Sequence, residues 1–457
     1  MKNLRLSLYA FHLYQTLDDP PDTVNQDAAN LWESLTNLAQ FLPFPELQTL
    51  KSQLISYSPD QEGNYQYSPQ GEDNLPNEWL THHGAEIEFT SIPTNAGFQL
   101  GGNLQPFRLH DTYCVDITLY PDIPDLGITI DQLSAFKPKA LIEGINANLG
   151  KVIWLTGENH YFTKPKPEEA QKWVNALCAG TNLNPQFIDE DKLFNCPLFR
   201  FEAQNLTLLV SLAKPKQADL ERANQDYSWF RDLLWSYQKI TFAYQEARAC
   251  YKSSRLIYGT LETKVQEFYA ILNQDSNTRV YQLDALLKAI PENVLYYNCY
   301  LRDLKSYYTT IAANKQNLKT CLNYLLTSGD TLKTWSAFTE QTCPRYLTQI
   351  QTYIDYLEPG KDLFSDLVNT IRATAAIEQS KRDKELQDNI QAVGVGIAAG
   401  AILSSSTGFL MEPWRLPNRE HRIPHPFIIS FFGSFILAFV AFQLAKWWIK
   451  RRRFKHQ

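Results

Sequence analysis

The 457-residue sequence predicts an α+β domain followed by a bundle of long helices, a stalk helix and two transmembrane helices. Of the 24 prolines, 17 lie at or before Pro215 and the next is Pro291, so long uninterrupted helices are expected only in the second half. In that half, apolar residues recur at steps of three and four. Near its end, the runs 390–411 and 427–445 contain no formal charge, and each is long enough to cross a hydrocarbon core of about 30 Å.

Residues 1–215 show the mixed patterns of a cytosolic α+β domain. Alternating or short apolar runs predict strands within Leu4–Leu8, Ile87–Phe89, Val115–Leu119, Val152–Leu155 and Leu206–Leu212. Helical spacing predicts helices over Ala28–Leu42, Glu46–Tyr57 and Pro167–Leu177, the last with a proline suited to a first helical turn. The polar stretch Ser58–Asn77 is predicted to be an exposed loop.

Residues 216–357 are predicted to form long antiparallel cytosolic helices. Apolar residues from Phe230 to Leu272 follow a heptad-like seam typical of a coiled coil. Similar spacing predicts a second helix through Leu304–Leu325 and a third through Trp335–Leu357, in which Pro344 indicates a kink. The sequence Glu358-Pro359-Gly360 is predicted to end the third helix.

Residues 358–389 are predicted to be a stalk that leads into the membrane. Leu363, Leu367 and Ile371 start a new apolar seam, and no proline follows until Pro413. One helix from about 361 to 411 is therefore expected, roughly 75 Å long. Its first half is the cytosolic stalk and its second half is the first span.

The membrane part is predicted to comprise two spans, residues 390–411 and 427–449, joined by an external loop over 412–426. Basic residues fix the orientation, because three precede the first span and six lie in the end of the chain, against three in the loop. Both termini, including the basic tail 450–457, are thus expected in the cytosol of a multi-pass protein of the inner or plasma membrane. A pair of buried core helices is the alternative.

Charge and cysteine content narrow the function class. The net charge is −6 although the end of the chain carries six basic residues, so the remainder sums to about −12; this argues for a membrane and against nucleic acid as partner. The seven cysteines are odd in number and scattered, which predicts reduced thiols. We find no signal peptide and no nucleophile–base arrangement, and expect no enzyme activity.

The first span is unusually rich in small and hydroxyl residues, whereas the second is rich in phenylalanine. Helical steps of three and four place the small residues on one face, which we expect to line a pore while the second span faces lipid. This hypothesis assigns the pore wall to Asn389, Val393, Gly396, Gly400, Ser404, Thr407 and Gly408. Close packing of small residues between helices, with no pore, is the alternative.

The order of these parts resembles the CorA-type magnesium transporter superfamily across the whole chain. In sequence, the resemblance is limited to the segment from Ser406 to Pro426 and to Lys446-Trp447-Trp448-Ile449-Lys450. It implies the family's fold, a homo-pentameric assembly and ion transport through a channel.

The family signature at the outer end of the first span is glycine, methionine, asparagine. Gly408 matches the glycine, but Phe409 and Leu410 occupy the next two positions. The asparagine of the family faces the hydrated cation. The resemblance therefore implies a divergent member whose substrate is open, with a divalent cation such as magnesium as a candidate.

Other motifs are weaker. His82-His83 and Glu158-Asn159-His160 lack metal-ligand spacing, and Gly101-Gly102 is predicted to be a turn. Carboxylates of the stalk are expected to be solvated partners of basic neighbours, with cation binding as the alternative, and no cofactor is expected. The second function hypothesis is a membrane-anchored sensor or effector whose cytosolic domain binds a ligand or partner. Cation flux into liposomes separates the two.

Overall fold

A computed structural model describes residues 1–15, 26–69, 78–158, 165–204, 206–213, 216–326, 330–405 and 426–454. The chain divides into two compact units. The first comprises Met1–Ser253 and Tyr300–Tyr356, and the second comprises Ser254–Cys299 and Leu357–Gln457. The α/β part lies in the first unit, and the apolar C-terminal segment lies in the second.

An eight-stranded sheet forms the centre of the first unit, in the order β4-β5-β6-β1-β7-β10-β9-β8. Neighbouring strands are antiparallel except β7 and β10, which are parallel. The strands are β1 (Lys2–Leu13), β4 (Ile87–Pro93), β5 (Gln99–Leu109), β6 (Thr112–Pro121), β7 (Gly150–Glu158), β8 (Gln186–Leu193), β9 (Cys196–Ala203) and β10 (Leu206–Ser211). A separate hairpin pairs β2 (Tyr57–Pro59) with β3 (Tyr65–Tyr67), inside the segment predicted to be a loop.

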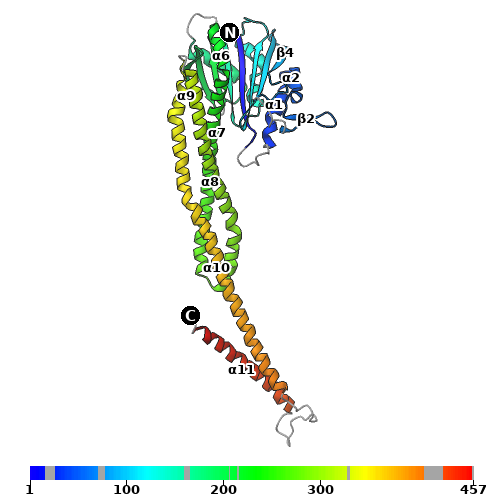
Figure 1. Ribbon diagram of the computed structural model, residues 1–457, viewed down its shortest axis with the longest axis vertical. Helices are drawn as coiled ribbons and strands as arrows, with labels where there is room; N and C mark the ends of the chain where they lie inside the picture. Colours follow the sequence, from blue (N-terminus) through cyan, green and yellow to red (C-terminus); the bar gives the residue numbers. More distant parts are fainter. Residues whose placement is uncertain are drawn as a thin grey trace. The chain divides into compact units, whose positions relative to one another are not determined.

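The sheet is covered on both faces, as its central strand shows. Leu6 and Leu8 of β1 belong to the main apolar core, whereas Tyr9 is buried on the other face and contacts Phe230. Short helices supply the main core and α7 (Tyr227–Leu272) covers the opposite face (Figure 1). The short helices are α1 (Asn30–Leu38), α2 (Pro45–Gln48), α3 (Leu50–Gln53), α4 (Pro138–Gly144) and α5 (Pro167–Leu177).

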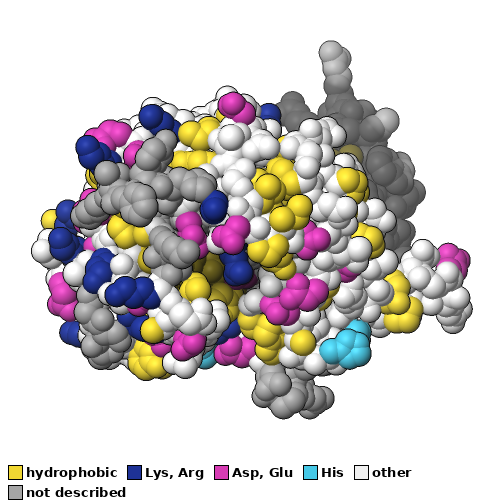
Figure 2. All heavy atoms as spheres, turned by 90° about the horizontal axis from the view of Figure 1, so that it is seen from above, with side chains coloured by type: hydrophobic (Ala, Val, Ile, Leu, Met, Phe, Trp, Pro, Cys, Tyr) yellow, Lys and Arg dark blue, Asp and Glu magenta, His cyan; other side chains and the backbone are white. Residues whose placement is uncertain are grey.

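The surface of this unit is chemically mixed on the face drawn in Figure 2. Its described acidic, basic and apolar side chains are interspersed there. Such a distribution is typical of a solvated surface.

The strands predicted from alternation are confirmed as β1, β4, β6, β7 and β10, and α5 has the predicted bounds. The prediction of a turn at Gly101-Gly102 is wrong, because both residues lie within β5. A Cβ at Gly102 would lie 2.4 Å from the carbonyl oxygen of Thr118 on β6, so glycine permits close strand approach here. The predicted helix Glu46–Tyr57 is instead α2 and α3, and Tyr57 begins β2.

Four long helices make up most of the remaining described chain: α7, α8 (Ser276–Leu326), α10 (Cys343–Ser405) and α11 (Pro426–Phe454). Shorter elements are α6 (Gln217–Gln225), α9 (Lys333–Ala337) and a π-helical turn (Phe338–Thr342). The π turn ends two residues before Pro344, where a kink was predicted, so the irregularity falls before the proline. The predicted end at Pro359 is wrong, because α10 continues through it.

Gly360, directly after Pro359, lies in a tightly packed part of α10. Pro359 removes one backbone N–H and so one helical hydrogen bond, a loss that tertiary packing can offset. Tyr297, which is fully buried, donates its hydroxyl hydrogen to the carbonyl of Leu357. The missing side chain of Gly360 makes room for that hydroxyl and for the ring of Tyr258. Proline and glycine thus act here as a packing site within a helix.

Candidate functional site

The apolar end of α10 packs against α11 through two glycines. A Cβ added to Gly396 would lie 2.9 Å from the carbonyl oxygen of Ala438 and 3.2 Å from Cβ of Phe442. One added to Gly400 would lie 3.1 Å from Cβ of Ala438 and 3.2 Å from the carbonyl oxygen of Ser434. The two helices therefore approach closely at these positions, as small residues allow in membrane helices.

The residues assigned to a pore wall do not share one environment. Gly396 is buried and Gly400 is partly buried, both against α11, whereas Asn389 and Val393 are exposed. Ser404 lies at the end of α10. Thr407 and Gly408 lie outside the described residues. For the two glycines, the geometry favours the alternative of close helix packing.

The opposite face of α10 is polar and small. At 100° per residue, Gln387, Gln391, Gly394 and Ala398 lie about half a turn away from the glycines that face α11. All four are exposed, and no atom approaches within 4 Å of a Cβ built at Gly394. Periodicity alone does not tell which of two small faces a neighbouring helix covers, and the assignment of a pore wall stays a prediction.

Helix α11 is the one helix among the described residues that is long and apolar enough to cross a bilayer. This segment is Ser430–Ile449, and none of its residues is buried. Phe435 and Phe439 are each more than 60% exposed, at 64% and 62%. The predicted first span is described only as far as Ser405, so its remainder, up to Met411, lies outside the described residues.

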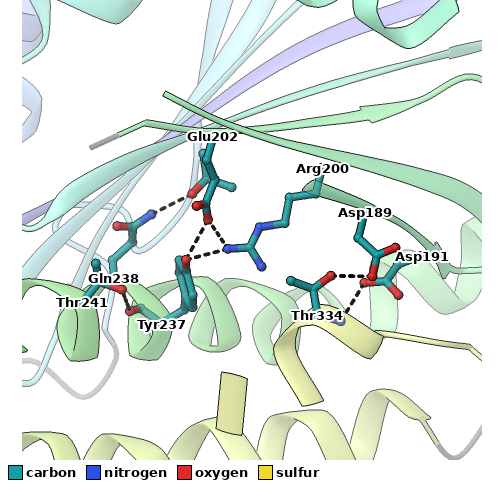
Figure 3. Close-up of polar contacts among 9 residues, drawn as sticks. Asp189, Asp191, Arg200, Glu202, Tyr237, Gln238, Thr241 and Thr334 are labelled. Carbon is teal, nitrogen blue, oxygen red and sulfur yellow. Dashed lines mark hydrogen bonds and ion pairs between the residues drawn. The ribbon is translucent and has the colours of Figure 1, made fainter. Parts of the chain in front are cut away.

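A polar network joins the sheet to α7 and α9 in the first unit (Figure 3). Arg200 of β9 is only 2% exposed, and its guanidinium lies over the rings of Tyr237 and Trp335, 4.7 Å and 5.0 Å from their centroids. One guanidinium nitrogen donates to Tyr237 Oη at 2.5 Å and also pairs with Glu202. A buried charge is thereby held between two aromatic faces and one carboxylate.

The edge strand β8 caps α9 beside this network. Asp191 accepts hydrogen bonds from the backbone N–H groups of Lys333 and Thr334, at 2.7 Å and 3.4 Å, and Asp189 accepts one from the Thr334 hydroxyl at 2.9 Å. Burial raises the pKa of Asp191, and the two backbone donors oppose that shift. Carboxylates at a helix N-terminus satisfy its unpaired N–H groups, so these aspartates have a structural role.

Stacked tyrosines join α7 and α10 within the first unit. The rings of Tyr244 and Tyr346 lie 3.6 Å apart, and those of Tyr251 and Tyr353 lie 3.8 Å apart, both nearly parallel. The spacing is seven residues on each helix, so the helices run parallel with a heptad repeat. Tyr244 and Tyr251 belong to the seam predicted for α7, and each contacts a tyrosine of α10.

Metal-ligating residues do not gather in the described part of the chain. No group of three or more histidine, cysteine, aspartate or glutamate residues there is placed to hold a metal ion. His82 and His83 are exposed, and His160 lies outside the described residues.

Known proteins that are similar to this chain were found among solved structures. No family model matches the chain, and no curated protein matches it. The CorA magnesium transporter from Methanocaldococcus jannaschii is similar over 66% of this chain and 90% of its own, with 14% identity and a TM-score of 0.28. The full-length CmaX protein is similar over 66% of this chain and 88% of its own, with 15% identity and a TM-score of 0.27. Similarity at this level assigns neither a family nor a function.

Proposed function

We propose that the chain is an oligomeric membrane channel or transporter for cations, of divergent CorA type, in which the apolar end of α10 lines the conduction path. The observation that carries this proposal is that two opposite faces of α10 have different surroundings. One face of α10 is covered by α11, and the opposite face presents Gln391, Gly394 and Ala398.

Amide and small side chains on that opposite face fit a hydrated ion better than they fit lipid. A glutamine exposed to hydrocarbon leaves polar groups without partners, whereas water and cations satisfy its carbonyl oxygen. Helix α11, with its exposed phenylalanines, suits the lipid side. A closed path of this kind requires several copies, so the proposal includes a homo-oligomer with both termini in the cytosol.

The test compares two glycines of the same helix. Gly394→Leu adds a bulky side chain to the proposed wall and is expected to reduce cation flux into liposomes at least tenfold, with the oligomer intact. Gly396→Leu adds the same group against α11 and is expected to disrupt hairpin packing and assembly. Unchanged flux in an intact Gly394→Leu oligomer would show that this face is not the wall.

A second function, a membrane-anchored sensor or effector, is favoured by one observation. Only α11 meets the length and apolarity needed to span a bilayer among the residues that the structure describes. One span suffices for a tether. This reading expects ligand or partner binding by the first unit with no flux above that of protein-free liposomes, whatever cation is offered.

A further inference from the structure

The C-terminal end of α11 is basic and has no acidic residue to balance it. The candidate span ends at Ile449, but α11 continues as helix to Phe454. Helix α11 contains no aspartate or glutamate. Its last three turns contain five basic residues, which are Lys446, Lys450, Arg451, Arg452 and Arg453. Counter-ions for these charges must come from outside the helix.

These basic positions surround the helix axis. At 100° per residue, the four consecutive residues from Lys450 to Arg453 cover about 300° of rotation. Whichever side of α11 meets protein, basic positions also lie on the sides that do not. The end of the helix is therefore a basic collar, defined by residues 446 and 450–453.

Two exposed tryptophans lie between the first residue of the basic collar and the other four. Trp447 and Trp448 are 56% and 57% exposed, as expected for indoles at the level of lipid headgroups. The guanidinium carbon of Arg451 lies 5.0 Å from the ring centroid of Trp447, and Nζ of Lys446 lies 5.8 Å from that of Phe442. Lys446 and Arg451 thus lie beside aromatic rings of an apolar helix.

The basic residues of α10 provide a contrast within the same unit. Lys381 pairs with Glu378 at 3.2 Å, and Arg382 lies over the ring of Tyr281. Acidic residues are interleaved with them along α10. In the described part of the chain, neither Lys446 nor Arg451 takes part in an ion pair.

We propose that the basic collar of α11 binds the headgroups of anionic phospholipids in the leaflet that surrounds it. Phosphate oxygens accept charge-assisted hydrogen bonds from guanidinium groups, often two at a time. An anionic leaflet also concentrates its lipids around a helix that presents uncompensated positive charge. The proposal requires α11 to lie in a bilayer and does not depend on ion transport.

The test counts the lipids that stay with the full-length protein. The chain is reconstituted in vesicles of equal parts phosphatidylcholine and phosphatidylglycerol and purified in a mild neutral detergent. Wild-type protein is expected to retain phosphatidylglycerol at least about fivefold over phosphatidylcholine. A fivefold enrichment corresponds to the attraction between about one basic residue and an anionic membrane surface. The triple variant Arg451→Gln, Arg452→Gln, Arg453→Gln is expected to lose this enrichment, and the triple arginine-to-lysine variant to keep most of it.

A matched control removes three charges elsewhere. Lys137, Lys166 and Lys172 are exposed in the first unit, and changing all three to glutamine is expected to leave lipid enrichment unchanged. Equal retention of both lipids by wild-type protein would overturn the proposal, as would loss of enrichment in 10 mM inorganic phosphate, which would indicate a site for free anions. Dissociation of the triple glutamine variant into monomers with unchanged lipid enrichment would also overturn it, because the collar would then bind a second copy.

Discussion

The packing around Gly360 makes a quantitative prediction about α10. In Gly360→Ala, the new Cβ would lie 2.6 Å from Tyr297 Oη, 2.8 Å from Cε2 of Tyr258 and 3.1 Å from Cε2 of Phe364. The Tyr297 ring is fully buried and its hydroxyl is bonded to Leu357, so it cannot swing aside without losing that bond.

Three contributions decide the result. Alanine in a helix interior is favoured over glycine by about 1 kcal/mol. Overpacking costs about 1–3 kcal/mol, and loss of the tyrosine hydrogen bond costs about 1 kcal/mol. We therefore expect Gly360→Ala to lower the free energy of unfolding by about 1–3 kcal/mol.

Gly259 on α7 is the matched control, because no atom lies within 4 Å of a Cβ built there. Gly259→Ala is expected to stabilise by up to about 1 kcal/mol. Thermal unfolding of the full chain in detergent, followed by intrinsic fluorescence, should separate the two variants in opposite directions from wild type. Stabilisation by Gly360→Ala equal to that by Gly259→Ala would refute the packing argument.

Three further predictions concern buried groups and the hairpin. Burial raises the pKa of Asp116 from 3.8 to about 6, so the folded state binds this proton more tightly than the unfolded chain does. The resulting stabilisation, at most about 3 kcal/mol, is fully present below about pH 4 and is lost as the pH rises through 6. Asp116→Asn should therefore make the melting temperature less dependent on pH between pH 4 and 7. Arg200→Met should destabilise the first unit by about 1–3 kcal/mol, because Tyr237 loses a buried donor, and hydrogen exchange in α9 should accelerate; unchanged exchange would contradict this. Gly396→Ala should lower the melting temperature in detergent relative to Gly394→Ala, and equal melting would show that α11 is not packed at Gly396.

Much of the fold follows from local patterns, because a strand with one face in a core must alternate. That rule found β1 and β7, where Leu6, Leu8 and Ile153 point into one core. It missed β5, since Gly101 and Gly102 have the composition of a turn, and only the closeness of β6 explains them. It also missed β8, which is acidic because its aspartates cap a helix distant in sequence.

Small residues in the first span predicted close helix packing as the alternative to a pore, but not which small face α11 covers. The sequence of the first span contains small residues at steps of three and four on more than one face, so the periodicity admits several pore walls. Which face meets α11 depends on the approach of Ala438 and Phe442, which lie on another helix and do not enter the local spacing of the first span. The break predicted at Pro359 was wrong, and local spacing does not show that Tyr297, 62 residues upstream of Pro359, packs against this turn of α10 and bonds to Leu357.

The stacked tyrosines of α7 and α10 limit how these helices can move. Tyr244 faces Tyr346 and Tyr251 faces Tyr353, with seven residues between the pairs on both helices. Sliding one helix along the other would separate both stacks at once, and a ring would meet a new partner only after a shift of about 10 Å. No register between these two would stack the rings again, so small axial sliding between the helices is disfavoured. Between these residues α7 and α10 are expected to move as one rod, so that a signal passing along them would be carried by bending or by rotation of the pair.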